Sequence, residues 1–284
     1  MKFVTFQKAG QNPEAGAVVG DHVVGLAGAG CPSIFDVLTT GAVARPGIEN
    51  WIKSPTSIGF PLNSVKLLAP IPRPPKLICV GLNYRDHALE SKMEIPKVPT
   101  IFSKFPSAVI APGESIVLPK NSTQPDYEAE FAFVIGKGGR HIPAGSWQQH
   151  VFGYTIINDV SARDYQMATT QWLMGKTFDT FAPMGPYIVS ADEIPDPHAL
   201  DISLTINGEV LQRSNTRELI FKIPELIAFL SSVFTLEAGD VVSTGTPAGV
   251  GVARKPQRFL RPGDDVVVRV QGIGELRNPV VAES

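Results

Sequence analysis

The sequence has few cysteines and lacks a long hydrophobic run. Two cysteines, Cys31 and Cys79, occur among 284 residues, too few for a disulfide framework, so a reducing compartment is favoured. No stretch of 18 apolar residues is present, which argues against a membrane-spanning helix. The first residues, MKFVTFQ, also lack the apolar centre of a signal peptide. We therefore expect a cytoplasmic protein, or one of the mitochondrial matrix if a leader was removed, with no membrane partner.

The sequence also lacks a charge of one sign. It has 25 basic and 27 acidic residues, a net charge of −2, and so creates no field that would attract nucleic acid. Hydrophobic residues make up 43% of the chain and charged residues 18%, as in an ordinary globular protein. Nucleic acid is therefore not an expected partner, and a hydrophobic core of normal size is expected.

Short strand patterns dominate what is present, because 26 glycines and 25 prolines punctuate the chain. The proline-rich segment 69–75 separates a small β-rich N-terminal domain, residues 1–69, from a larger domain, residues 70–284. In the first domain, a short helix should start after the N-cap Ser33 and end before Gly41. The larger domain lacks the regular strand–helix alternation of a doubly wound sheet or TIM barrel. The predicted fold class is mixed α/β and strand-rich.

Three acidic side chains occur where strands begin or end. Glu128 and Glu130 are two residues apart in the strand pattern YEAEFAFVI, so they point to the same face. Asp159 ends the apolar strand pattern VFGYTIIND. Neighbouring carboxylates repel each other and need a counter-charge, which a hard divalent cation with oxygen ligands would supply. The alternative is a solvent-exposed strand end with solvated acids.

Other polar residues near these acids could hold a substrate or move a proton. Arg163 and Gln166 follow Asp159 at helical spacing and could hold a carbonyl or carboxylate between them, and Lys176 adds a second cation. His87 and Glu90 are one helical turn apart, so they could hydrogen-bond and shuttle a proton. Ordinary surface charges and a surface histidine are the alternatives.

A glycine-rich loop, residues 245–251, follows a strand pattern. It lacks the Gly-Lys-Ser/Thr ending of a phosphate-binding P-loop, and no helix pattern follows it. The loop therefore indicates either backbone contacts near a ligand or a plain turn.

Six motifs together resemble the fumarylacetoacetate hydrolase superfamily. They occur in the order of that family over residues 76–277: CVGLNYRDHALE, FSKFPSAV, PDYEAEFAFVIGK, GYTIINDVSARDYQ, GKTFDTFAPMGP and GDVVSTGTPAGVG. The stretches QWLMGKTFDTFAPMGP, SNTRELIFK and GVGVARKPQRFLRPGD most resemble its domain-containing protein 2 branch. The resemblance implies a β-roll catalytic domain and a homodimer.

The resemblance also assigns roles to single positions. It implies that Mg²⁺ or Mn²⁺ is held by Glu128, Glu130 and Asp159. Catalytic roles fall on the proton-shuttling pair His87 and Glu90 and on Lys176. Substrate-binding roles fall on Arg163, Gln166 and Thr246.

The chemistry implied by the resemblance is stabilisation, by a divalent cation, of the enolate of a small 2-keto acid or 1,3-dicarbonyl compound. The favoured reaction is keto–enol tautomerisation of oxaloacetate or a similar dicarboxylate. Hydrolysis of a C–C bond in an acylpyruvate, fumarylpyruvate or fumarylacetoacetate, and decarboxylation of oxaloacetate, remain alternatives because they share this enolate. A metal-dependent binding protein without turnover is the non-enzymatic alternative, and the intact His87–Glu90 pair argues against it.

Overall fold

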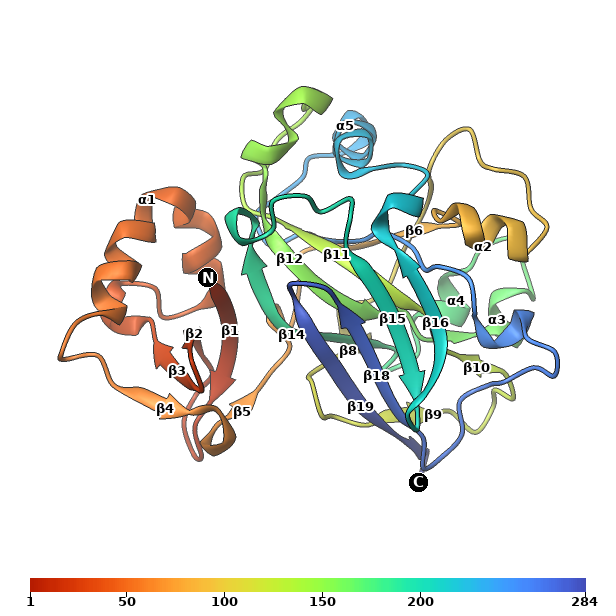
Figure 1. The fold of residues 1–284 in the computed structure, drawn as a ribbon, viewed down its shortest axis with the longest axis horizontal. Helices are drawn as coiled ribbons and strands as arrows, with labels where there is room; N and C mark the ends of the chain where they lie inside the picture. Colours follow the sequence, from red (N-terminus) through yellow and green to blue (C-terminus); the bar gives the residue numbers. More distant parts are fainter.

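The computed structural model describes the backbone of residues 1–284 and all side chains except those of residues 41–44. Strands form most of the regular structure, as Figure 1 shows. The helices are short apart from the first and last: α1 (Ile34–Ile52), α2 (Arg85–Glu90), α3 (Arg163–Gln166), α4 (Leu173–Lys176) and α5 (Ile223–Val233). Among the described residues, no helix combines the length and the apolar composition needed to cross a bilayer. The predicted strand-rich, mixed α/β class is confirmed.

A large sheet of twelve strands runs through the molecule. In spatial order its main path is β4 (Gly59–Pro61), β3 (His22–Gly25), β2 (Glu14–Val19), β1 (Lys2–Gln7), β14 (Ala182–Ser190), β12 (Val151–Asn158), β11 (Ala129–Ile135), β17 (Val241–Ser243), β6 (Leu77–Gly81) and β7 (Thr100–Ser103). Two short strands attach to its sides, β5 (Lys66–Leu67) to β1 and β8 (Val109–Ile110) to β14.

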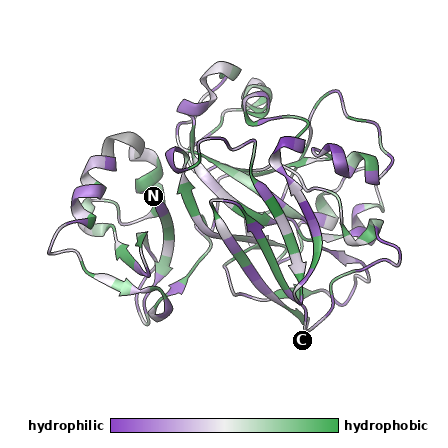
Figure 2. Cartoon of the chain, viewed as in Figure 1, coloured by the Kyte–Doolittle hydropathy of each residue, from purple (hydrophilic) through white to green (hydrophobic). Residues whose placement is uncertain are grey.

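A second sheet of five strands packs in front of the first in Figure 1. Its order is β16 (Glu209–Asn215), β15 (Asp201–Ile206), β18 (Asp265–Val270), β19 (Gly274–Ala282) and β9 (Ile116–Leu118). Apolar side chains of both sheets form one buried cluster, in which Phe131 and Ile156 of the large sheet lie with Leu204 and Val268 of the second. Along the strands of the second sheet, hydrophobic residues alternate with hydrophilic ones, as the colours in Figure 2 show. A two-stranded ribbon, β10 (Pro125–Asp126) with β13 (Ser161–Ala162), lies beside them.

The N-terminal segment joins the large sheet rather than forming a sheet of its own. Strand β1 pairs antiparallel with β14, with Phe3 opposite Ile188. Phe3 and Leu38 belong to the same hydrophobic cluster as Val134 of β11. The domain boundary at residue 69 remains a prediction.

Helix α1 begins where the sequence predicted and ends later. Ser33 and Asp36 form a capping box, in which the Asp36 N–H donates to Ser33 Oγ and the Ser33 N–H donates to the Asp36 carboxylate. The predicted end before Gly41 is wrong, because α1 continues to Ile52. Ile48 in the second half is buried in the cluster that holds Phe3, and such tertiary packing outweighs the low helix propensity of one glycine.

Four strands place their ends at the same edge of the large sheet. Strands β6 and β17 are parallel, so their carboxyl ends lie together. Strand β11 is antiparallel to both β17 and β12, with Ala132 opposite Ser243 and Ala129 opposite Asn158. The beginning of β11 and the end of β12 therefore lie at that edge as well. Ligand sites form at strand ends of this kind, where loops leave the sheet.

Candidate functional site

The three acidic side chains converge at this edge. Glu128 directly precedes β11, Glu130 lies on it, and Asp159 directly follows β12. Each contributes a carboxylate oxygen, and these oxygens all lie within 4.8 Å of one another. All three residues are buried, with 5%, 2% and 0% of their surface exposed, so the alternative of solvated acids at an exposed strand end is wrong. Buried carboxylates at this spacing are a donor set that fits one hard divalent cation.

The carboxylates differ in how much positive charge they have nearby. Burial raises the pKa of Glu130 well above its usual range, and the negative charges of Asp159 and Glu128 add to this shift. Burial would also raise the pKa of Glu128, but the nearby Lys176 and Arg163 outweigh it and hold that pKa at about 2. Glu130 has neutral donors instead, because its carboxylate accepts hydrogen bonds from Ser243 Oγ and the Gly245 N–H. Glu130 is therefore the acid with the greatest need of a cation.

Two buried lysines face the acids. Lys176 Nζ donates to Glu128 Oε2 at 2.7 Å and to Asp159 Oδ2 at 2.8 Å. Lys104 Nζ donates to the other oxygen of Asp159 and to the Val160 carbonyl. Lys104 was not predicted as a site residue, although it lies within the motif FSKFPSAV, because its position 55 residues before Asp159 gives no local signal of their contact.

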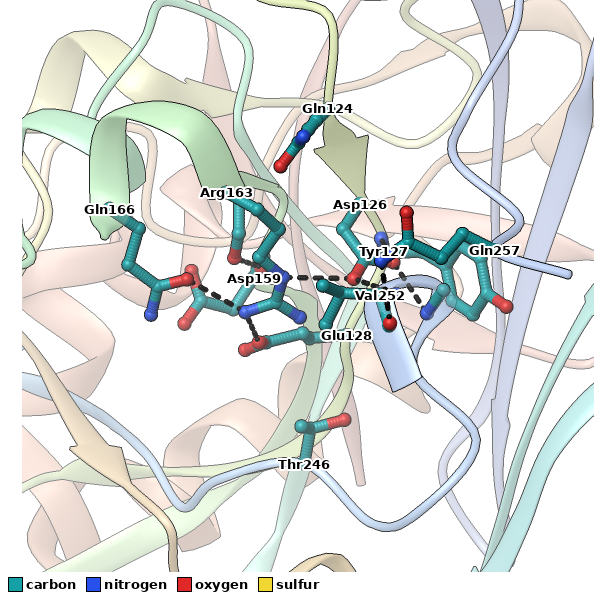
Figure 3. Close-up of polar contacts among 12 residues, drawn as sticks. Gln124, Asp126, Tyr127, Glu128, Asp159, Arg163, Gln166, Thr246, Val252 and Gln257 are labelled. Atoms are coloured by element: carbon teal, nitrogen blue, oxygen red, sulfur yellow. Dashed lines mark hydrogen bonds and ion pairs between the residues drawn. The ribbon is translucent and has the colours of Figure 1, made fainter. Parts of the chain in front are cut away.

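Arg163 lies at the start of α3 and binds three neighbours, as Figure 3 shows. Its Nε donates to Asp126 Oδ2 at 2.8 Å, and its Nη1 donates to Glu128 Oε1 at 2.7 Å and to Gln166 Oε1 at 2.8 Å. Its Nη2 is buried and has no hydrogen-bond partner among the described residues. A buried donor without a partner is costly, so Nη2 is suited to an oxygen atom of a ligand. Asp126 was also not predicted, since nothing in its local pattern separates it from a surface acid.

The predicted pair His87 and Glu90 is formed. His87 Nδ1 lies 3.3 Å from Glu90 Oε2 on α2. The Glu90 carboxylate also accepts from the Gly249 N–H, at 2.9 Å and 3.1 Å to its two oxygens. This second contact fixes the carboxylate, which in turn orients the imidazole ring.

The glycine-rich loop borders the site through its backbone. The Gly245 N–H binds Glu130 and the Gly249 N–H binds Glu90. At Gly245, φ is +97° and an added Cβ would lie 2.9 Å from the Val80 carbonyl oxygen, so glycine is required there. Thr246 is buried, and its Oγ1 accepts a hydrogen bond from Gln212 Nε2 at 2.8 Å. The loop is therefore part of the site's wall rather than a plain turn.

A small cavity of about 100 Å³ opens onto these residues, and its lining includes His87, Glu128, Glu130, Arg163, Lys176 and Thr246. Trp172 and Phe102 also line it, with ring centroids 5.6 Å apart. Trp172 lies directly against the chain at Gly81, where an added Cβ would be 2.2 Å from the indole ring. A larger cleft of about 590 Å³ lies beside α1, but the three-acid cluster is not part of its lining. The acid-lined cavity thus combines space for a small ligand with the three-acid cluster.

Comparison with known proteins agrees with this geometry. The family model Fumarylacetoacetate (FAA) hydrolase C-terminal matches residues 76–281. The mitochondrial oxaloacetate tautomerase Fahd2a of Rattus norvegicus is 51% identical over 223 residues, which cover 78% of this chain and 71% of the relative. The fumarylacetoacetate hydrolase domain-containing protein 2 homolog of Dictyostelium discoideum is 46% identical over 244 residues, which cover 82% of this chain and 80% of the relative.

A solved structure extends the similarity over the whole chain. It is the maleylpyruvate hydrolase from Sphingobium sp. SYK-6 in complex with manganese (II) ion and pyruvate, which has a TM-score of 0.85 and 31% sequence identity and covers 100% of both chains. The six motifs, the strand-rich fold and these relatives agree: the chain belongs to the fumarylacetoacetate hydrolase family, in the domain-containing protein 2 branch that its sequence indicated.

Proposed function

We propose that the chain is an enzyme that uses Mg²⁺ or Mn²⁺ to form the enolate of a small 2-keto acid, with keto–enol tautomerisation of oxaloacetate or a similar dicarboxylate as its reaction. The observation that carries the proposal is the set of three buried carboxylates, with oxygens within 4.8 Å, facing a cavity of about 100 Å³. The name of the rat relative, an oxaloacetate tautomerase, supports the choice of reaction. The manganese ion and pyruvate bound to the maleylpyruvate hydrolase support a metal and a 2-keto acid.

Glu128, Glu130 and Asp159 would hold the metal ion through their carboxylate oxygens. When bound, the ion supplies a Lewis acid that polarises the 2-oxo group and offsets the negative charge of an enolate. Among the buried residues of the site, these three acids and Asp126 would carry four negative charges if all were ionised, as metal ligands are, whereas Lys104, Arg163 and Lys176 carry three positive charges. A divalent ion would turn this excess negative charge into an excess positive charge, which favours an anionic substrate.

The side chains around the cavity would bind the substrate and stabilise its charge. Arg163 Nη2, which has no partner among the residues that the structure describes, would donate to a carboxylate oxygen. Lys176 Nζ, within 2.8 Å of two of the acids, places a positive charge near the developing oxyanion. Thr246 and Gln166 line the same cavity and add polar contacts.

His87 would move the proton. When Nδ1–H donates to Glu90, the other ring nitrogen, Nε2, is free to accept a proton. In the keto-to-enol direction, Nε2 would take a proton from C3 of the substrate and deliver that proton to the oxygen at C2, so the imidazole returns to its starting state and no atom is added or lost. The reverse direction returns the proton to C3.

Hydrolysis of a C–C bond is the second candidate, supported by the maleylpyruvate hydrolase with 31% identity. It would need His87 to activate a water molecule and the cavity to hold a longer substrate. The cavity volume of about 100 Å³ favours the shorter oxaloacetate. Decarboxylation of oxaloacetate would start from the same enolate.

The test follows the enol absorbance of oxaloacetate. We expect the protein to accelerate the loss of the enol signal, EDTA to abolish the acceleration, and Mg²⁺ or Mn²⁺ to restore it to different degrees. A panel of acylpyruvates and fumarylpyruvate, followed in parallel, separates hydrolysis from tautomerisation. Mn²⁺ binding without turnover of any of these compounds would support the non-enzymatic alternative and contradict the proposal.

We also propose a homodimer and, from the names of the relatives, a location in the mitochondrial matrix. The homodimer is the assembly that the family resemblance implies. Light scattering after size-exclusion chromatography would test the dimer, and a monomer mass near 30.5 kDa would contradict it.

A further inference from the structure

A fourth buried carboxylate, Asp126, lies two residues before Glu128 on the short strand β10. It is completely buried and accepts four hydrogen bonds. Oδ2 accepts from Arg163 Nε at 2.8 Å and from the Val252 N–H at 2.9 Å, and Oδ1 accepts from the Gly251 N–H at 2.7 Å and from its own neighbour Tyr127 at 2.8 Å. The side chain therefore connects the substrate-facing arginine to the far end of the glycine-rich loop, as Figure 3 shows.

On the arginine side, Asp126 determines where the free nitrogen lies. Asp126 holds Nε, and Glu128 together with Gln166 holds Nη1. A guanidinium group is planar and rigid, so two anchored nitrogens fix the position of the third. Nη2, buried and without a partner among the described residues, is placed by these anchors.

On the loop side, the Asp126 carboxylate is in close contact with the backbone of Gly251 and Val252. An added Cβ at Gly251 would lie 2.5 Å from Asp126 Oδ1, so the carboxylate and the loop approach each other as closely as glycine permits. The loop carries Thr246 and Val250, and Val252 directly follows it; all three residues line the cavity. Asp126 thus sets the distance between Arg163 and the opposite wall of the cavity.

We propose that Asp126 is a positioning residue that sets the affinity for the anionic substrate without touching it, by holding Arg163 and the end of the glycine-rich loop at a fixed distance from each other. The identity of that anion, a 2-keto acid, rests on the proposed function. Asp126 is not one of the three proposed metal ligands, so its effect falls on substrate binding rather than on metal binding.

The main test is Asp126→Asn. The amide keeps the size of the side chain, but its NH₂ group faces donors where the carboxylate accepted hydrogen bonds. We expect KM for oxaloacetate to rise roughly tenfold or more, the cost of one charge-assisted hydrogen bond, while kcat and Mn²⁺ affinity stay close to wild type. Asp240→Asn is the matched control, since Asp240 is also completely buried and binds Lys76 far from the cavity, and its KM should be unchanged.

A double-mutant cycle with Arg163→Lys separates positioning from a general structural role. If Asp126 acts through Arg163, its substitution adds little to the KM of the Arg163→Lys variant. Independent, additive effects would overturn the proposal. Should Asp126→Asn fail to fold, Asp126→Glu keeps the charge but displaces its position, and a wild-type KM in that variant would also overturn it.

Calorimetric binding of oxalate in the presence of Mn²⁺ gives a readout that needs no turnover. We expect weaker oxalate binding to Asp126→Asn than to wild type or Asp240→Asn. Failure of the wild type to act on oxaloacetate would refute the proposed reaction, whereas equal oxalate affinity in wild type and Asp126→Asn would refute the role of Asp126.

Discussion

The two ends of the parallel strand pair β6 and β17 carry buried charges in different arrangements. At the amino end, Lys76 Nζ lies 3.1 Å from Asp240 Oδ2 and also contacts Glu237. Asp240 accepts in addition from the Glu237 N–H at 2.8 Å. At the carboxyl end, Glu130 shares a pocket with two other acids, and the donors that bind its carboxylate among the described residues are the neutral Ser243 Oγ and Gly245 N–H. The amino end is closed by its own ion pairs, whereas at the carboxyl end we propose that a bound metal ion completes the charge balance.

The difference follows from where the chain goes next. Beyond the carboxyl ends of β6 and β17 the chain enters loops that border the cavity. Glu130 lies at this edge and forms hydrogen bonds with neutral donors rather than an ion pair with a lysine or arginine. Around Asp240 the chain stays compact, and the lysine preceding β6 meets the aspartate preceding β17 across the parallel pair. Similar residues thus form ion pairs within the fold at one end and the proposed binding site at the other.

The largest expected effect is the loss of metal binding when an acid at the carboxyl end is replaced, and the accompanying change in stability should differ between the acids. Glu130→Gln and Asp159→Asn should each lower Mn²⁺ affinity by more than about 100-fold and abolish activity. Without metal, Glu130→Gln should raise the free energy of unfolding by about 1 kcal/mol because it removes an acid whose ionisation is opposed by burial and by two nearby like charges. Asp159→Asn should lower it by about 3 kcal/mol because it removes the carboxylate that Lys104 and Lys176 share.

Calorimetric Mn²⁺ titration and urea unfolding in EDTA measure both quantities. We argue that Asp159 is bound by positive charges and that Glu130 is not. Stability changes of the same sign in the two variants would contradict this difference. Unchanged Mn²⁺ affinity in both would refute the assignment of the metal ligands.

The next largest effect concerns proton transfer by His87, which lines the cavity at the carboxyl end of the strand pair. His87→Ala should lower kcat roughly 10²- to 10⁴-fold, the usual contribution of a general base, and leave Mn²⁺ affinity unchanged. His22→Ala, on the exposed side of β3, is the control and should behave as wild type. A parallel loss of Mn²⁺ affinity would mean that His87 is itself a metal ligand.

At the amino end, Asp240→Asn should affect stability alone. Lys76 keeps Glu237 as a partner, so we expect the free energy of unfolding to fall by about 1 kcal/mol or less. kcat, KM and Mn²⁺ affinity should not change. If any of the three did, the two ends of the strand pair would not be independent.

The smallest effect is the pH dependence of the Lys76 cluster. Burial lowers the pKa of Lys76, but its hydrogen bonds to Glu237 and Asp240 outweigh this and raise that pKa above its ordinary value. The stabilisation is therefore fully present below the unfolded lysine pKa of about 10.4 and is lost as the pH rises through the folded value. Because Lys76 is partly exposed, we expect less than about 1 kcal/mol.

Urea unfolding of wild type and Lys76→Met between about pH 9 and pH 11.5 would measure this term. The stability difference between the two proteins should shrink towards the alkaline end. A difference that stays constant over this range would show that the ion pair does not contribute.

Local sequence patterns predicted the parts of the site that depend on strand geometry. Glu128 and Glu130 are two residues apart on a strand, and the side-chain period of a strand places them on one face. Asp159 was found because it ends an apolar strand pattern. The contact of His87 with Glu90 follows from helical spacing, and the structure confirms it.

Local patterns failed where packing between distant segments decides the outcome. The end of α1 was misplaced at Gly41 because Ile48 packs into a cluster with Phe3, which no helix-capping signal contains. The substrate-binding role of Gln166 stays a prediction: it lines the cavity, and its side-chain oxygen accepts a hydrogen bond from Arg163, a contact that helical spacing alone did not specify. Lys104 and Asp126 gave no signal because their partners, Asp159 and Arg163, lie 55 and 37 residues away.

The sequence alone determined the strand-rich class, the family and the residues whose side chains can take part in catalysis or binding. Periodicity and motifs reveal these features because they depend on residues close together in the chain. Only the tertiary structure decided which charges are neutralised by neighbours and which are left for a ligand. That balance depends on contacts between strand ends far apart in the chain and on their burial, where removal from water makes each missing partner costly.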